Sequence, residues 1–325
     1  MVADTYVVGV DGGATKTVAV IGTPATILGR GESGSSNYHN IGAVAAGKAI
    51  RTAVLNAEKQ AGLRRTRIRT AVVALAALDS KRGIQIARRF VREANIAETV
   101  FVIHDSVAAF YAATKGKPGI IVNSGTGSFA AGVNRLGNYV RVGGWGYLID
   151  DEGSAFDIGM KAVTSGFRMI DGRTQPTQLI ALLKNRFGVG MFDEILDRIY
   201  SGRISVEEIA ELAPAVSKAA SRDIACRQIL REAGTSLAEL VCTAASRLNM
   251  TKTSFPLIIV GGGFKSGRPF FTPFMSEVRR RCPRAKPVKL QEEPAKGAYL
   301  VAAKLVPRGP NALVHRDRWL RELVN

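Results

Sequence analysis

A short polar segment near the start of the chain carries the residue types that phosphate binding needs. The segment Asp11-Gly12-Gly13-Ala14-Thr15-Lys16-Thr17 separates two apolar, β-branched runs, which predicts a hairpin with this segment at its tip. Gly12 and Gly13 let the backbone approach an anion, while N–H groups and the hydroxyls of Thr15 and Thr17 can donate to phosphate oxygens. Asp11, at a strand end, could hold a hydrated Mg²⁺. A hairpin that uses Asp and Gly for turn geometry alone has the same composition.

A second glycine-rich segment repeats this design. The strand Ile120–Val122 leads into Asn123-Ser124-Gly125-Thr126-Gly127-Ser128, and the apolar run Phe129–Val133 follows. Aligning Val10 with Val122 superimposes the two segments at a constant offset of 112 residues. Neither segment is a Walker or Rossmann loop, because GxxxxGK[ST] is absent and the glycine turn leads to a strand. Two such hairpins facing one another across a cleft would hold a polyphosphate from both sides.

Strands and helices alternate between the two hairpins. A helix capped by Asn40, with apolar positions at Val44, Ile50, Val54 and Leu55, ends near Gly62. The other predicted elements are a buried strand, a helix, a strand and a helix, at 71–78, 83–94, 100–103 and 106–113. This alternation predicts an α/β lobe, in which ligands collect at the carboxyl ends of the strands, where three carboxylates occur: Asp11, Asp79 and Asp105.

Composition narrows the class of protein. The 325 residues are 46% hydrophobic and 22% charged, which is typical of a globular chain long enough for two domains. The formal net charge of +18 would attract polyanions, and basic residues cluster at 64–69 and 279–286. These clusters lack interleaved aromatic residues and a known nucleic-acid motif, so they favour a solvated surface over specific nucleic-acid binding. Anionic small molecules fit the same charge.

The sequence also bears on location and cysteine chemistry. The longest apolar run, Ala71–Leu78, is far shorter than the roughly 18 residues of a membrane-spanning helix. The start of the chain lacks the basic and apolar regions of a secretory signal, so a cytoplasmic protein is expected. Cys226, Cys242 and Cys282 have no paired spacing, which argues against a disulfide framework or a metal cluster and favours buried thiols.

Eight short motifs in order resemble one known family. They are Asp11–Thr17, Asn37–Asn40, Leu78–Ser80, His104–Asp105, Ser124–Ser128, Gly143–Gly146, Asp151–Ser154 and Val260–Gly263. The set resembles the N-acetylglucosamine kinase branch of the BadF/BadG/BcrA/BcrD-type ATPase family and is similar to archaeal broad-specificity hexokinases. The resemblance implies the actin-like ATPase fold, an α/β architecture of two ribonuclease-H-like lobes with ATP and sugar bound in the cleft between them. It assigns residues 1–117 to the first lobe, 118–304 to the second, and 305–325 to a tail that is expected to be helical.

The resemblance implies roles for the nucleotide-binding residues. Asp105 matches the general base that accepts the proton of the attacking sugar hydroxyl, although an Asp at this place could also cap the following helix. Asp11 would position Mg²⁺ through water, with Asp105 nearby. The phosphate-binding residues would be Asp11, Gly12, Gly13, Thr15, Lys16, Thr17, Gly125, Thr126, Gly127 and Ser128. Gly261, Gly262 and Gly263 resemble the adenosine motif, and a simple glycine loop after a strand is the alternative.

The implied sugar site uses side chains that can exchange hydrogen bonds with several hydroxyls. The matching positions are Asn37, Asp79, Asp105, Gly143, Gly144 and Asp151. Asp150 and Glu152 flank Asp151, so an assignment shifted by one residue stays open. Ala76 and Ala77 stand where the family commonly has glycine.

The resemblance implies an ATP-dependent kinase that phosphorylates the 6-hydroxyl of glucose, N-acetylglucosamine, glucosamine or mannose. ATP and Mg²⁺ would be its cofactors, and a homodimer its assembly, without specific nucleic acid or membrane partners. Two alternatives keep the same hairpins. One is an ATPase that activates a dehydratase or reductase, although the three cysteines lie outside the pattern that such proteins use for an iron–sulfur cluster. The other is an ATP-gated binding protein of the actin and Hsp70 type.

Overall fold

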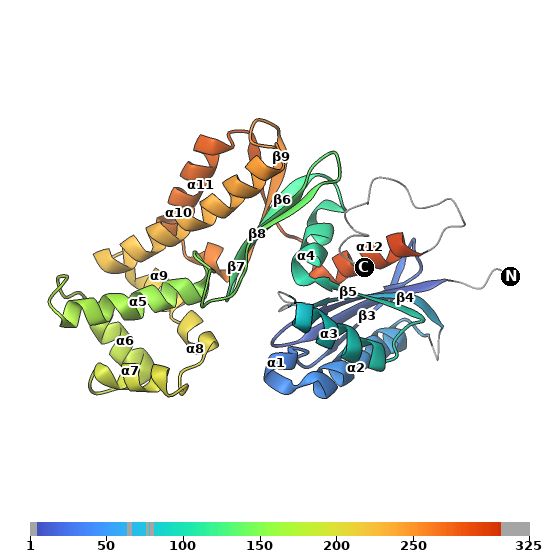
Figure 1. Ribbon diagram of the computed structural model, residues 1–325, viewed down its shortest axis with the longest axis horizontal. Helices are drawn as coiled ribbons and strands as arrows, with labels where there is room; N and C mark the ends of the chain where they lie inside the picture. The colour runs from blue at the N-terminus through green and yellow to red at the C-terminus, as the bar shows by residue number, and fades with distance from the viewer. Residues whose placement is uncertain (1–4, 64–66, 76–77, 79–80, 307–325) are drawn as a thin grey trace. The chain divides into compact units, whose positions relative to one another are not determined.

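The computed structural model describes residues 5–63, 67–75, 78 and 81–306, which form two compact units (Figure 1). The first unit contains the described residues up to Pro118, the segment Val133–Tyr139, and the described residues from Leu290 onward. The second contains Gly119–Gly132 and Val140–Lys289. Each unit has its own five-stranded sheet. Most of the predicted tail, at 307–325, lies outside the described residues.

The sheet of the first unit has the strand order β3-β2-β1-β4-β5. The pairs β1–β2 and β2–β3 are antiparallel, whereas β1–β4 and β4–β5 are parallel. The strands are β1 (Tyr6–Gly12), β2 (Thr17–Gly22), β3 (Ile27–Ser33), β4 (Ile68–Leu75) and β5 (Thr99–His104). Central strands covered on both faces are expected to be apolar throughout, which explains the unbroken apolar runs in β1 and β4.

Helices cover both faces of this sheet (Figure 1). One face, with Val10, packs on α2 and α3, while Gly9 points to the other face and contacts α12. A Cβ on Gly9 would lie 1.9 Å from the backbone nitrogen of Tyr299, and one on Gly297 would lie 1.8 Å from the carbonyl oxygen of Ala108 in α4. The helices of this unit are α1 (Tyr38–Ile41), α2 (Ala43–Gln60), α3 (Lys81–Glu93), α4 (Asp105–Thr114) and α12 (Pro294–Leu305).

The position of α12 differs from the division expected from the sequence, in which residues 118–304 form one lobe. α12 packs on β1 and α4 and so lies in the first unit. Gly9 and Gly297 bring these backbones closer than any side chain would allow. The chain therefore returns to its first unit before it ends, a contact across more than 280 positions that local sequence patterns do not reveal.

The second unit repeats the arrangement with the strand order β10-β9-β6-β7-β8. Its strands are β6 (Gly119–Ser124), β7 (Ser128–Val133), β8 (Tyr139–Gly143), β9 (Phe255–Val260) and β10 (Ala285–Lys289). Its helices are α5 (Ala155–Ile170), α6 (Leu179–Phe187), α7 (Asp193–Tyr200), α8 (Val206–Ala210), α9 (Ala213–Ala219), α10 (Ile224–Arg247), the 3₁₀ helix η1 (Gly262–Lys265) and α11 (Arg268–Arg281). One core joins the sheet to these helices, with Phe270 and Phe274 of α11 fully buried against α10.

The two sheets have the same order when β1 to β5 are matched with β6 to β10. The internal repeat that the glycine-rich hairpins predict is therefore present at the level of whole sheets. Asp11 and Asn123, the aligned residues, lie at equivalent places near the ends of β1 and β6.

The first predicted helix needs a local correction. Asn40 does not cap it, because Asn40 lies inside α1 and Gly42 precedes the first residue of α2. Val44 and Leu55, expected in the core, are exposed, while small and aliphatic residues such as Ala46, Ile50 and Val54 are buried. Alanine and glycine carry much of the buried face because α2 approaches β3 closely, as at Gly31, where a Cβ would lie 2.2 Å from a helix carbonyl oxygen.

Two further expectations concern cysteines and membranes. Cys226, Cys242 and Cys282 are free and buried, as predicted. Within the described parts of the chain, no helix combines the length and the apolar character needed to span a bilayer.

Candidate active site

The tip of the first hairpin is an exposed turn held by its own backbone. Gly13 donates its N–H to the carbonyl oxygen of Lys16 at 3.0 Å, which leaves Thr15 and Lys16 exposed. Thr17 differs from these two residues. It is fully buried in β2, and its hydroxyl donates to the carbonyl oxygen of Gly34 at 2.8 Å. The Thr17 hydroxyl thus donates its proton to the protein backbone, whereas Thr15 and Lys16 are exposed to solvent.

The segment after β3 supports this tip. Ser36 donates its N–H to the carbonyl oxygen of Gly13 at 3.2 Å. Gly12 lies directly against it, because a Cβ on Gly12 would come within 2.3 Å of the Ser36 Oγ. The Ser36 hydroxyl is buried and has no hydrogen-bond partner among the described residues. Sequence reasoning did not identify Ser36, although it immediately precedes the predicted Asn37.

Asn37 caps a short helix. Its side-chain Oδ1 accepts a hydrogen bond from the N–H of His39 at 3.1 Å at the start of α1. The carbonyl half of the amide therefore orders the loop, and the amino half is the part suited to a ligand hydroxyl. Asp79, the next predicted sugar residue, lies outside the described residues.

Asp105 lies at the first position of α4, directly after β5. The helix is capped by His104, whose Nδ1 accepts from the N–H of Ser106 at 3.2 Å, so capping does not explain Asp105. His104 Nδ1 is 2.8 Å from the buried Oδ1 of Asp105. Because this nitrogen acts as an acceptor in the cap, a neutral ring has no proton there to donate. A protonated ring would instead pair with Asp105 Oδ1, which accepts no hydrogen bond from the described residues while the ring is neutral.

Asp11 has a strongly perturbed carboxyl group. Its pKa is raised from 3.8 to about 7, chiefly by burial and then by the negative charges of Asp105 and Glu293, while Lys16 opposes the rise. Asp11 and Asp105 are thus close enough to repel each other when both are ionised. A cation bound there would relieve this repulsion and favour the ionised carboxylates.

This pair suits Mg²⁺ better than a metal held entirely by protein side chains. Among the described residues, no group of three His, Cys, Asp or Glu side chains is arranged to hold a metal ion. Mg²⁺ commonly uses one or two carboxylates and takes its remaining ligands from water and substrate phosphates. Asp11 and Asp105 meet that requirement.

The second hairpin is held by the loop that precedes α5. Ser128 donates its N–H to Asp151 Oδ1 at 3.0 Å and its hydroxyl to the carbonyl oxygen of Glu152 at 2.7 Å. The tip is closed by a bond from the N–H of Gly125 to the carbonyl oxygen of Gly127 at 2.9 Å. Asp151 is buried and has a φ of 73°, and its carboxylate occupies the space that a side chain at residue 127 would need.

A cavity of about 680 Å³ opens beside this hairpin, within the second unit. It brings together two predicted phosphate residues, Gly125 and Thr126, and two predicted adenosine residues, Gly262 and Gly263. Sequence reasoning missed the rest of its wall, which comes from α8, α9 and the end of η1 and includes Glu207, Glu211, Pro214, Ser217, Lys265 and Ser266. These helices contain no glycine motif, and their place in the cavity wall follows from their packing on α5.

The three consecutive glycines serve different purposes. A Cβ on Gly261 would lie 2.2 Å from the carbonyl oxygen of Ser124, and one on Gly263 would lie 1.9 Å from the Ser124 Oγ. These two glycines let β9 pack against the end of β6. A Cβ on Gly262 would meet nothing within 4 Å, and Gly262 faces the cavity. The alternative of a structural glycine loop thus explains Gly261 best, whereas Gly262 leaves room for a ligand.

The predicted Gly143 and Gly144 form a turn that Arg141 holds. Both glycines have positive φ, of 75° and 80°, which few other residues adopt. The Arg141 guanidinium donates to both of their carbonyl oxygens and lies 5.8 Å from the ring centre of Trp145. Trp145 is 63% exposed and donates its N–H to Asp150 Oδ2 at 3.3 Å. Arg141 and Trp145 were not predicted, and both order the turn proposed for sugar contact.

Comparison with known proteins decides the family. Residues 8–302 match the BadF/BadG/BcrA/BcrD ATPase family. The chain belongs to this family. Among curated relatives, an N-acetylmuramic acid/N-acetylglucosamine kinase of Clostridium acetobutylicum is 27% identical over 91% of this chain and 98% of its own length. An N-acetyl-D-glucosamine kinase of Dictyostelium discoideum is 26% identical over 91% of this chain and 97% of its own.

The crystal structure of a putative N-acetylglucosamine kinase from Chromobacterium violaceum matches this BadF/BadG/BcrA/BcrD ATPase family member with a TM-score of 0.75. The two are 27% identical, and the match covers 92% of this chain and 99% of the other. The repeated mixed five-stranded sheets and this match confirm the predicted actin-like ATPase fold.

Proposed function

We propose that this protein is an ATP-dependent sugar kinase that transfers the γ-phosphate of ATP to the 6-hydroxyl of a hexose. Glucose, N-acetylglucosamine, glucosamine and mannose are the candidate acceptors, and the names of the two curated relatives favour the N-acetylated amino sugar. The observation that carries the proposal is the position of Asp105 directly after β5, with a side chain that is 36% exposed and close enough to Asp11 of the first hairpin for their charges to interact. A partly exposed carboxylate at a strand end is suited to accept a proton from an alcohol.

Asp105 would act as the general base. The sugar hydroxyl oxygen forms a bond to the γ-phosphorus, the bond from that phosphorus to the bridging oxygen breaks, and ADP leaves. The hydroxyl proton moves to the Asp105 carboxylate and is later released to solvent.

The first unit would contribute phosphate contacts from backbone and side chains at its hairpin tip. Thr15 and Lys16 are exposed and supply a hydroxyl and a positive charge, while Gly12 and Gly13 supply close backbone approach. Thr17 is assigned a structural role because its hydroxyl already donates to Gly34. Mg²⁺, held by Asp11 and Asp105 through water, would neutralise phosphate charge when it is bound.

The second unit would bind the nucleotide. Its 680 Å³ cavity falls within the size range of small-molecule sites. Thr126 and the backbone of Gly125 and Gly127 are assigned to the phosphates, and Gly262 to the adenosine. Ser128 is assigned to holding the hairpin, because its N–H and hydroxyl both bond to the loop of Asp151.

The sugar contacts are assigned to side chains and backbone around ordered loops. Asn37 and Asp105 would serve from the first unit, and Gly143, Gly144 and Asp151 from the second. Asp79 stays a prediction of the sequence. A hexose that lacks a partner hydroxyl would leave one of these polar groups unsatisfied, which is the physical basis of selectivity.

A coupled ADP-release assay tests the proposal. The purified protein is incubated with MgATP and glucose, mannose, glucosamine or N-acetylglucosamine, with a control that contains no sugar. We expect sugar-dependent ADP release, and ³¹P-¹H correlation NMR of the product should locate the phosphate on carbon 6. ATP hydrolysis that is unaffected by every sugar would reject the kinase and favour an ATPase or an ATP-gated binding protein.

The expected homodimer stays a prediction. Size-exclusion chromatography with light scattering separates the 34.7 kDa chain from an assembly of twice that mass. A monomer would reject the predicted assembly without affecting the assignment of the activity.

A further inference from the structure

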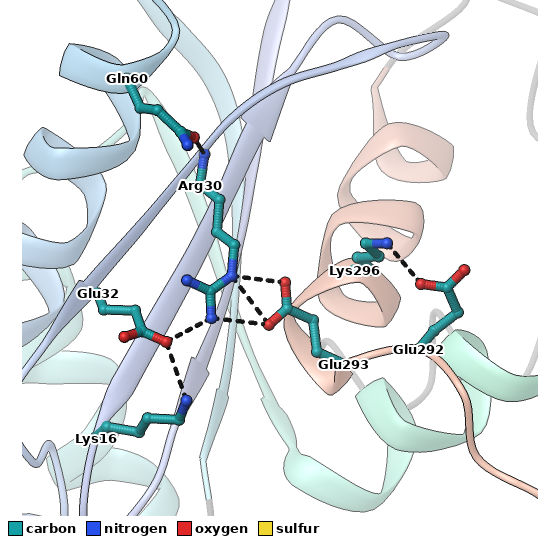
Figure 2. A network of polar contacts seen from close by, with 7 residues as sticks. All are labelled: Lys16, Arg30, Glu32, Gln60, Glu292, Glu293 and Lys296. Carbon is teal, nitrogen blue, oxygen red and sulfur yellow. Dashed lines mark hydrogen bonds and ion pairs between the residues drawn. The ribbon is translucent and has the colours of Figure 1, made fainter.

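Four charged side chains form a continuous network beside the first hairpin (Figure 2). We call Lys16, Glu32, Arg30 and Glu293 the Arg30 network. Lys16 Nζ lies 3.0 Å from Glu32 Oε1, and Glu32 also accepts from the Arg30 guanidinium. The network starts at the exposed hairpin tip, passes along β3, and ends at the first turn of α12.

The pairing of Arg30 with Glu293 has the geometry that makes an ion pair specific. Arg30 Nε lies 2.9 Å and 3.1 Å from the two carboxylate oxygens of Glu293, and Arg30 Nη2 lies 3.1 Å from Oε2. Such a fork fixes the direction of both side chains, which a single contact between flexible charges does not. The backbone N–H of Arg30 donates to the Gln60 side chain, so the strand that carries the fork is itself tied to α2 (Figure 2).

Glu293 occupies the N-cap position of α12 without capping it. Its side chain makes no hydrogen bond to the first turn of that helix, although a carboxylate there could do so. The carboxylate instead reaches β3, 263 residues earlier in the chain. The Glu293 side chain therefore binds Arg30 on β3, next to the first hairpin, and does not cap its own helix.

The network lies next to the proposed phosphate site. The negative charge of Glu293 raises the pKa of Asp11, and the positive charge of Lys16 lowers it. The four side chains sum to zero charge while Arg30 is present. Without Arg30, the network would carry a net charge of −1 beside the place where a triphosphate has to bind. Glu293 would lose its cationic partner, and Glu32 would pair with Lys16 alone.

We propose that Arg30 and Glu293 are positioning residues for MgATP, which orient Glu32 and through it Lys16 at the tip of the first hairpin. The exposed contact between Lys16 and Glu32, with side chains 60% and 44% exposed, contributes little stability. Lys16 can therefore exchange Glu32 for a phosphate oxygen at low cost, while Arg30 keeps Glu32 in place. This inference rests on the proposed nucleotide-binding role of the hairpin.

The test measures MgATP binding by isothermal titration calorimetry, without sugar, together with the KM values and kcat of the kinase assay. Arg30→Gln should raise the Kd and KM for MgATP about tenfold, and leave kcat and the KM for sugar within about threefold. Arg30→Lys, which keeps the charge but lacks the fork, should give an intermediate rise. Combining Arg30→Glu with Glu293→Arg should leave the affinity for MgATP low, because a carboxylate at position 30 repels Glu32 instead of holding it.

Glu292→Gln is the matched control. Glu292 neighbours Glu293 and forms its own ion pair with Lys296 at 2.6 Å, outside the Arg30 network. This variant should bind MgATP as the parent does. An unchanged Kd for MgATP in Arg30→Gln and Arg30→Lys would overturn the inference, even if their melting temperatures fall. A parent protein that binds MgATP but phosphorylates no sugar would reject the proposed kinase and leave the positioning role standing.

Discussion

The carboxylate of Asp151 accepts a hydrogen bond from the backbone N–H of Ser128 at 3.0 Å. A residue predicted from its motif to bind sugar thus also fixes the shape of the second phosphate hairpin. One carboxylate oxygen lies against the backbone of Gly127, where any side chain would displace it. The loop of Asp151 and the second hairpin are therefore held together by direct contacts, and a change in one is expected to affect the other.

Asp151→Ala should damage both stability and nucleotide binding. It leaves the buried N–H of Ser128 without an acceptor and places alanine at a φ of 73°, which together should cost about 2–4 kcal/mol of unfolding free energy. Asp151→Asn keeps an acceptor oxygen and tolerates that φ, so it should fold normally and raise only the KM for sugar. Urea unfolding and steady-state kinetics of the two variants measure this difference.

Asp150→Ala serves as the control for a shift of one residue. Asp150 accepts a 3.3 Å hydrogen bond from the backbone N–H of Trp145, and its side chain is also hydrogen-bonded to that of Glu152. If Asp150→Ala proves more damaging than Asp151→Ala, the assignment belongs to the neighbouring carboxylate.

Asp11 makes stability depend on pH in the metal-free protein. Because its pKa is raised from 3.8 to about 7, the folded protein binds this proton more tightly than the unfolded chain does. The stability associated with it is complete below the ordinary pKa and is lost as the pH rises through about 7. Asp11→Asn should therefore be more stable than the parent at pH 8, by on the order of 4 kcal/mol, and nearly equal to it at pH 4.

Urea unfolding at pH 4, 6 and 8 with a chelator present measures this trend. A stability difference that is the same at every pH would show that Asp11 titrates normally. Asp11→Asn should also lose kinase activity, because the Asp11 carboxylate, which lowers stability when it is ionised, is the group proposed to hold the metal beside the phosphates.

The glycines after β9 offer a paired test of packing against ligand contact. Gly263→Ala places a Cβ 1.9 Å from the Ser124 Oγ and should lower the unfolding free energy by about 1–3 kcal/mol. Gly262→Ala meets open space and should fold like the parent, but its methyl group enters the cavity and should weaken ATP binding. Thermal unfolding with and without ATP separates the two effects. Equal loss of stability in both variants would contradict the assignment of Gly262.

Sequence patterns predicted the features that depend on local chemistry. Apolar β-branched runs that end in glycine turns located both hairpins, and their spacing revealed the repeated sheets, because turn geometry restricts which residues can follow a strand. The carboxylate of Asp105 was likewise expected at a strand end. The sequence did not show that His104, and not Asp105, caps α4, since either residue type can cap a helix.

Features that depend on distant contacts were missed for a physical reason. Arg30 and Glu293 are 263 positions apart, and neither stands in a motif that suggests a partner. The placement of α12 rests on two glycines that resemble ordinary loop or helix glycines until their neighbours are known. The walls of the cavity in the second unit come from α8 and α9, whose sequences encode amphipathic packing and carry no ligand signature.

Asp105→Asn tests the central claim most directly. The amide keeps the size of the side chain but cannot take a proton from an alcohol, so kcat should fall at least about a hundredfold while the Kd for MgATP and for sugar stays within a few fold. Calorimetry and the coupled ADP-release assay, run on the same preparation, give both quantities. Turnover close to that of the parent, with binding intact, would contradict the assignment of Asp105 as the general base.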